Sequence, residues 1–346
     1  MALKSFNLLT STARDIQQLF DRSELNAESL VKQVLNQVNK HNRNGLNLGA
    51  LISVAPREQL LERARFLDQE RAAGKARSPL HGIPFIVKDA IATDPQLGMD
   101  TTAGGWALVG SRPPRNAPTV QKLLDAGGIL IGKASLTEFN NFKGQNLIDG
   151  WSPVNGYTRS AYVRGPLKLD EGAMGHSTLS DAGVHVEYPV LLPPGDNVWP
   201  GIGDIISYEF QRVFNRYLET LDSSQVKNLK ELVDWNRQHA DKELPKEHPS
   251  QSSLENVLQC NISAAENAET LAFLRKLAGP DGIDQVLNLF KLDAAVSLAD
   301  SPISSVASVA GYAIATMPLG VLDLNGRPFG VSMTATTACF TGGTNP

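Results

Sequence analysis

The sequence predicts an α/β fold, because a helical first third is followed by a strand–loop–helix–strand unit. Two short apolar runs rich in β-branched residues, Gly82–Val87 and Ile129–Ile131, have the character of buried strands. Between them a helix is expected from about Pro118 to Ala126, where a Gly-Gly pair ends it. A strand, a crossover helix and a second strand form the unit from which α/β sheets are built.

Each of the three early helices has a signal at its N-terminus. Thr12 can cap a helix that runs roughly to Arg22, and Asn26 can cap a second helix. A third helix is expected to begin after Pro56 and to stop at Gly74. The apolar positions that recur with helical spacing are Ile16, Leu19, Phe20, Leu30, Val31, Val34, Leu35, Val38, Leu60, Leu61, Ala64 and Leu67.

The second half of the chain predicts helices and a few separate strands. The pattern is helical from Asp204 to about Gly279, and Ser223 or Ser224 can cap a helix within that stretch. The segment Gly165–Gly183 has no clear period, and we interpret it as a junction. The later strands are expected at Val184–Leu192, Asp293–Leu298 and Phe329–Met333.

Composition favours a cytoplasmic protein without nucleic-acid or membrane partners. The 346 residues are 42% hydrophobic and 20% charged, and the net charge of -4 offers no basic patch for a nucleic acid. The chain contains no apolar window of about 18 residues and no signal-peptide pattern at its start. The pair Cys260 and Cys339 does not suggest a disulfide framework, and the six histidines lack metal-ligand spacing. We therefore expect no metal and no cofactor.

The sharpest motif is Pro79–Asp89, which places Lys88 at the end of a buried strand. A lysine there can serve as a base if its surroundings lower its pKa. It can also simply leave the core and enter solvent beside Asp89, and structural lysines outnumber catalytic ones. The motif by itself leaves both interpretations open.

Several separated motifs resemble the amidase-signature family, in its fungal and bacterial branch, and they occur in the family's order. The early ones are Pro79–Asp89, Asp100–Gly104, Asn116–Leu124, Gly132–Lys133, Leu136–Phe139 and Gly150–Gly156. The late ones are Asp293–Val296, Gly311–Tyr312 and Gly326–Gly330. The resemblance covers about Leu8 to Arg164, resumes near Asp181 and fades after Val331.

The resemblance implies a mixed β-sheet flanked by helices on both faces, and a hydrolase that cleaves the C–N bond of a carboxamide. In the family a lysine is the base, a first serine bridges, and a second serine attacks the carbonyl. Lys88 matches the family's lysine. Because a lysine accepts a proton only when neutral, we expect Lys88 to be buried away from carboxylates. Its neighbour Asp89 need not pair with it, since adjacent strand residues point to opposite faces.

The chain departs from the family after Tyr162–Gly165. There the family carries a glycine- and serine-rich run that supplies the bridging serine, the oxyanion donors and the nucleophile, whereas this chain continues with Pro166–Asp170. The sequence therefore predicts an internal deletion with its junction near residues 165–180. Ser177 and Ser180 lack the glycines of a nucleophile motif, and His176 has no acidic partner placed by the sequence.

These observations predict a single amidase-like domain at residues 1–333, incomplete and shortened at its C-terminal end, with a polar tail at 334–346. Our first hypothesis is an amidase-family protein with lost or strongly impaired activity. One alternative is an active amidase that has rebuilt its site and acts on a small-molecule amide. Another is a non-catalytic binding or regulatory partner in a homo- or heterodimer. The deletion is also expected to leave unpaired strand edges and exposed apolar surface.

Overall fold

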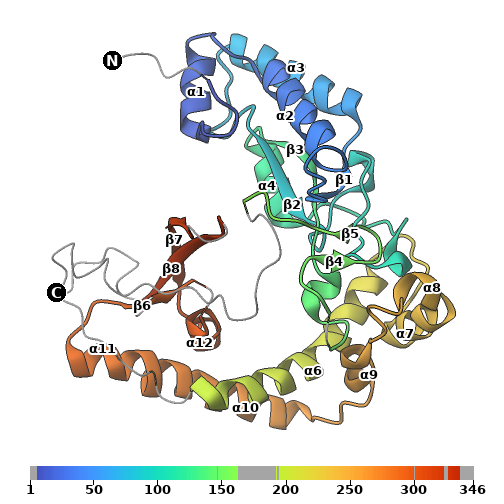
Figure 1. The fold of residues 1–346 in the computed structure, drawn as a ribbon, viewed down its shortest axis with the longest axis vertical. Helices are drawn as coiled ribbons and strands as arrows, with labels where there is room; N and C mark the ends of the chain where they lie inside the picture. Colours follow the sequence, from blue (N-terminus) through green and yellow to red (C-terminus); the bar gives the residue numbers. More distant parts are fainter. Residues whose placement is uncertain are drawn as a thin grey trace. The chain divides into compact units, whose positions relative to one another are not determined.

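The computed structural model describes residues 6–145, 147–162, 192, 195–299, 301–322 and 326–335, with the backbone alone for residues 195–200. The chain divides into two compact units (Figure 1). The first unit combines Met1–Ala161 with Gln211–Gln259, and the second combines Tyr162–Phe210 with Cys260–Pro346. The helix α6 (Gly195–Glu219) belongs in part to each unit.

The three early helices form where the sequence predicts them. In α1 (Ala13–Asp21) the hydroxyl of Thr12 accepts a hydrogen bond from the amide of Asp15, whose carboxylate in turn accepts from the Thr12 amide. In α2 (Ala27–His41) the side chain of Asn26 accepts from the Ser29 amide at 2.8 Å. The helix α3 (Arg57–Ala72) follows Pro56 directly. All three predicted starts are confirmed.

The first unit contains a mixed sheet of three strands in the order β1–β3–β2. The strands β2 (Pro84–Lys88) and β3 (Ile129–Ala134) run parallel, and α4 (Pro118–Asp125) lies between them in the chain. The predicted crossover unit is therefore confirmed, and with it the α/β fold class. The strand β1 (Leu51–Val54) pairs antiparallel with β3 and was not predicted.

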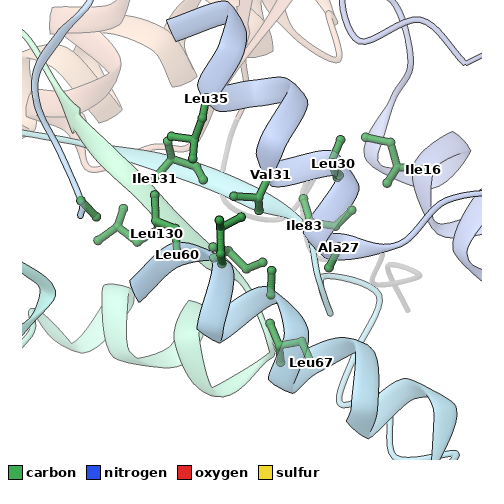
Figure 2. Packing of buried hydrophobic residues seen from close by; sticks show 14 of the residues in the cluster. Ile16, Ala27, Leu30, Val31, Leu35, Leu60, Leu67, Ile83, Leu130 and Ile131 are labelled. Atoms are coloured by element: carbon green, nitrogen blue, oxygen red, sulfur yellow. The ribbon is translucent and has the colours of Figure 1, made fainter. Parts of the chain in front are cut away.

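Helices and sheet of the first unit enclose one apolar core. Figure 2 shows side chains of α2 and α3 meeting those of β3, with Ile16 and Ile83 beside them. The residues labelled there are Ile16, Ala27, Leu30, Val31, Leu35, Leu60, Leu67, Ile83, Leu130 and Ile131. Burial of these apolar side chains is the main driving force for the fold of this unit.

The remainder of the first unit consists of short elements. They are the 3-10 turns η1 (Pro95–Leu97), η2 (Trp106–Leu108) and η3 (Glu138–Asn141), the hairpin of β4 (Trp151–Ser152) and β5 (Gly156–Tyr157), and the helices α7 (Leu229–Gln238), α8 (Ala240–Glu243) and α9 (Ser252–Leu258).

The cap of α7 differs from our prediction. The prediction that Ser223 or Ser224 caps the next helix is wrong, because the side chain of Asn228 accepts from the amide of Glu231 at 2.9 Å. The backbone of Ser223 instead forms an antiparallel bridge with the backbone of Arg112.

Within the described residues the second unit carries an antiparallel sheet, the first part of α6 and four further helical segments. The strands β6 (Ala295–Leu298) and β8 (Pro328–Thr334) confirm two predicted strands, and β7 (Ile314–Val321) pairs with β8 on its other side. The strand β7 escaped prediction because Pro318 and Gly320 interrupt its apolar pattern. The further helical segments are α10 (Ala264–Ala278), the π turn η4 (Gly279–Asp284), α11 (Gln285–Phe290) and α12 (Ile303–Ala310).

Several sequence predictions fall outside the described residues. They are the junction at Gly165–Gly183, the strand at Val184–Leu192 apart from its last residue, and the tail beyond residue 335. Within the described parts of the chain, no helix has the length and apolar character needed to cross a membrane.

We expect two glycine substitutions to have opposite effects on stability. A Cβ on Gly132 would lie 2.6 Å from the carbonyl oxygen of Ser53, so Gly132→Ala must push β1 away from β3. The cost should be about 1–3 kcal/mol. Gly203 lies in α6 with open space around it, so Gly203→Ala should stabilise the protein by about 0.5–1 kcal/mol. Urea unfolding of both variants measures the difference, and equal effects would contradict the packing described for β1 and β3.

Candidate active site

Lys88 ends β2 and is exposed to solvent. Val87 and Asp89 on either side of it are buried, and strand alternation therefore directs Lys88 away from them. In the described residues no hydrogen bond or ion pair involves its side chain. Our expectation that Lys88 is buried is wrong for this structure, because the face of β2 from which Lys88 projects is open to solvent in the described part of the chain. Ile86, on the same side of β2, is also 51% exposed.

The side chain of Asp89 points inward. It binds the turn at Thr102–Gly105 and does not contact Lys88. Its Oδ2 accepts hydrogen bonds from the Thr102 amide at 3.2 Å, from the Thr102 hydroxyl and from the Gly104 amide at 3.3 Å. The backbone carbonyl of Asp89 also accepts from the Ala103 amide at 3.3 Å. The prediction that Asp89 and Lys88 do not pair is confirmed.

The amides of this turn are fully used inside the protein. Besides those bound by Asp89, the Gly105 amide donates to the Thr102 carbonyl at 3.0 Å, and the Trp106 amide donates to Glu243 Oε1 at 2.6 Å. An oxyanion hole requires amides that are free to meet the developing charge. As folded here, the turn is a supporting element and offers no such pair of donors.

A second lysine, Lys133 on β3, is fully buried behind the turn. Its Nζ donates to the Ile91 carbonyl at 2.6 Å and to the Thr101 hydroxyl at 2.8 Å, and it lies 3.8 Å from Asp89 Oδ1. Burial lowers the pKa of Lys133 to about 8, against the attraction of Asp89 and Asp100. Burial likewise raises the pKa of Asp89, while its bonds to Thr102 and the charge of Lys133 oppose that change.

In the sequence Lys133 was predicted only as part of a family motif, without a role of its own. A signal was present, since the lysine directly follows the buried run Ile129–Ile131 and a glycine. A polar residue that continues an apolar strand is a candidate for burial with a partner.

Three charged side chains form a buried cluster on the other side of the turn. Lys143 Nζ lies 2.6 Å from Glu138 Oε2 and 2.6 Å from Glu243 Oε2, and none of the three is exposed. Burial and the neighbouring carboxylate of Glu243 raise the pKa of Glu138 well above its usual value, although Lys143 opposes them. Because Glu243 also binds the Trp106 amide, the cluster ties the turn to α8. The sequence did not reveal this contact, which joins residues a hundred positions apart.

The backbone beside the cluster is strained. Phe139, Asn140 and Asn141 have φ values of 50°, 57° and 69°, and Ala103 has a φ of 49°. Non-glycine residues adopt such angles only where their surroundings impose them. Here the Phe139 amide donates to the Ala103 carbonyl at 2.9 Å, so the two strained segments hold each other.

Two serines near this region, the half-buried Ser135 and the buried Ser152, are engaged with Asn155. Its amide nitrogen Nδ2 donates to the Ser135 hydroxyl at 2.7 Å, and its backbone amide donates to the Ser152 hydroxyl at 3.3 Å. Neither hydroxyl contacts Lys88. Ser177 and Ser180 lie outside the described residues. In the described ranges no group of three or more His, Cys, Asp or Glu residues could hold a metal ion.

The fold of this chain is similar to that of solved amidases. A solved peptide amidase from Stenotrophomonas maltophilia matches 95% of this chain and 94% of its own, with a TM-score of 0.80 and 23% identity. The sequence model of the Amidase family matches residues 30–163. The mixed sheet and the Lys88 motif lie within the matched region.

Two relatives show how the similarity is distributed. A protein named as an amidase in Arabidopsis thaliana is 25% identical over 95% of this chain and 87% of its own length. Another, from Schizosaccharomyces pombe, is 48% identical over 96 residues, which are 28% of this chain and 16% of the relative. The strongest similarity is thus confined to a short stretch, and the chain spans only a small part of the fungal relative.

The Arabidopsis alignment also contains many positions without a counterpart here. It is 455 positions long, whereas 95% of a 346-residue chain is roughly 329 residues, so roughly 126 positions (455 less 329) have no residue of this chain. The family match ends at residue 163, just before the predicted junction.

The two lysines at the ends of β2 and β3 should differ sharply in their effect on stability. We expect Lys133→Met to cost about 3–5 kcal/mol, because it leaves the buried carboxylate of Asp89 without its cation. Lys88→Met, the matched control on the neighbouring strand, should stay within about 0.5 kcal/mol of the parent. Urea unfolding measures both, and a large cost for Lys88→Met would show that Lys88 is not the exposed side chain described here.

The raised pKa of Glu138 predicts a pH-dependent loss of stability. In the unfolded chain a glutamate loses its proton near pH 4.3, while the folded state keeps it to higher pH. The folded state then binds more protons, so the free energy of unfolding falls as pH rises from about 4.3 through the raised pKa. Glu138→Gln should remove this decline in a pH series of urea titrations.

Glu70→Gln is the control for that experiment. The bond from Arg77 lowers the pKa of Glu70, so this carboxylate stabilises the fold above its unfolded pKa and loses that contribution as pH falls. Its removal should therefore change the profile on the acid side only. If Glu138→Gln keeps the parent's decline in stability above about pH 4.3, the assignment is refuted.

Proposed function

We propose that this chain is an amidase-family protein, related to hydrolases of carboxamide C–N bonds, whose hydrolytic activity is lost or strongly impaired. The observation that carries the proposal is the state of Lys88. It is exposed at the end of β2, and no hydroxyl within the described residues contacts it.

The chemistry explains why this matters. A hydroxyl is a weak nucleophile until a positioned base removes its proton, and a lysine does so only when it is neutral. Within the described residues no hydroxyl lies beside Lys88 to give up its proton. The amides of the turn at Thr102–Gly105 already donate to groups within the protein. They are therefore not free to stabilise an oxyanion.

The alignment supports a missing nucleophile segment. Roughly 126 positions of the 455-position Arabidopsis alignment lack a residue here, and the family match ends at residue 163. The unmatched alignment positions and the end of the family match both agree with a deletion whose junction lies near residues 165–180. The 48% identity with the fungal relative supports the fungal-type branch that the motifs suggested.

An active amidase with a rebuilt site is the first alternative, and one observation favours it. Lys133 has a pKa lowered to about 8 and a hydroxyl, that of Thr101, at 2.8 Å. A base and a hydroxyl are therefore paired in the protein. Lys133 and Thr101 are both buried, however, so a small-molecule amide cannot reach them without opening the turn. We rank this alternative second for that reason.

A non-catalytic binding or regulatory partner is the other alternative. Apolar side chains are exposed on two edge strands: Ile86 on β2, and Met317, Leu319 and Val321 on β7. Exposed strand edges of this kind favour pairing with another chain, in a homodimer or with an intact relative. Cys260 is unpaired in the described residues, which fits a reducing cytoplasmic location.

Labelling with a fluorophosphonate tests the proposal. We expect no serine of the purified chain to react, while an intact peptide amidase treated in parallel reacts fully. Ammonia release from a simple carboxamide should be at background level and should be the same for the parent chain and Lys88→Met. A mass-shifted serine whose labelling disappears in Lys88→Met would establish an active site and overturn the proposal. Labelling lost instead in Lys133→Met would support the rebuilt site.

A further inference from the structure

The second unit contains a groove that the proposed function does not use. It has a volume of about 390 Å³, within the range of small-molecule sites. Three helices, α6, α10 and α12, form its walls. The lining residues are Ile202, Ile205, Ile206, Leu271, Arg275, Ser304, Ser305, Ser308, Val309 and Gly311.

Close helix packing shapes the groove. A Cβ on Gly201 would lie 2.9 Å from the side chain of Leu274, so the glycine allows α6 to approach α10. The next turn of α6 then presents Ile202, Ile205 and Ile206 to the groove. Ile206 remains 38% exposed, which is unusual for a large apolar side chain on a wall facing other apolar residues.

Arg275 is the one charged residue of the lining, and it has no partner in the described residues. The adjacent cation differs, because Lys276 Nζ lies 3.5 Å from an oxygen of Asp281. An unpaired guanidinium beside an apolar wall favours an anion, and its planar fork matches a carboxylate in particular.

The serines of α12 add hydrogen-bonding capacity at the same groove. Ser308 donates to the Ser304 carbonyl at 2.7 Å, and Ser304 makes a long contact of 3.5 Å with the Ser301 carbonyl. The Ser305 hydroxyl makes no hydrogen bond to the part of the chain that the structure describes. It is therefore free to donate to a bound ligand.

We propose that this groove binds an amphipathic monocarboxylate, with its hydrocarbon chain along the isoleucines of α6 and its carboxylate on Arg275 and Ser305. A single cation calls for a single negative charge, and the apolar wall calls for an unbranched or simple hydrocarbon. The site lies in the second unit and involves no residue of the Lys88 region. It is therefore independent of whether the chain hydrolyses amides.

Calorimetric titration of the full chain with octanoate, decanoate and dodecanoate, each below its micelle concentration, tests the proposal. Affinity should rise about fourfold for each added methylene, which is the transfer free energy of a buried CH₂ group. Decanol, which has the same tail without the charge, should bind at least tenfold more weakly than decanoate. No measurable binding of any carboxylate, or equal affinity for decanol, would overturn the proposal.

Two neighbouring cations provide matched variants. Arg275→Gln should weaken decanoate binding about tenfold or more and leave decanol unchanged. Lys276→Gln removes a charge one residue away that does not line the groove, and its decanoate affinity should equal that of the parent. Thermal melts check that both variants fold. Equal losses in the two variants would show a diffuse charge effect instead of a site, and an unaltered Arg275→Gln would rule out the carboxylate contact.

Discussion

Strand alternation at the end of β2 controls the arrangement of the Lys88 region. Val87 and Asp89 are buried, so Lys88 between them is directed outward. Asp89 then becomes the inner anchor of the turn at Thr102–Gly105, with Lys133 behind it. The direction of the Lys88 side chain is therefore set by the burial of its neighbours, and no hydrogen bond or ion pair of that side chain contributes within the described residues. A change at Asp89 would disturb the position of Lys88 and the turn together.

Buried charges hold the same turn from two sides. Asp89 with Lys133 lies on one side, and Glu138, Lys143 and Glu243 lie on the other. Such groups seldom stabilise a protein more than apolar residues of the same size would, but removal of one partner is costly. Their effect is to specify one backbone path. That path includes the positive φ angles at Ala103 and Phe139, which an apolar core would not enforce.

Local signals in the sequence predicted local structure well. The caps at Thr12 and Asn26, the start after Pro56 and the crossover unit all form as expected, because each depends on residues within a few positions. Contacts between distant segments were not predictable in the same way. The bond between Lys143 and Glu243 has no local signature, and β1 is too short to show a period.

The exposure of Lys88 also depends on distant segments of the chain and was not predictable from local signals. Alternation gave its direction, but what covers that side of β2 depends on strands contributed from elsewhere in the chain. The apolar core that the early helices form with the sheet of the first unit lies between Ile16 and Ile131, before the end of the family match at residue 163.

Formation of that core therefore does not require the segment that carries the family's nucleophile. Apolar side chains are exposed instead on the edge strands, with Ile86 on β2 and Met317 on β7. In this fold the packing of the N-terminal core and the assembly of catalytic hydroxyls depend on different parts of the sequence. The lysine motif, the turn and the buried charges all form without any contact to a hydroxyl at Lys88 in the described residues.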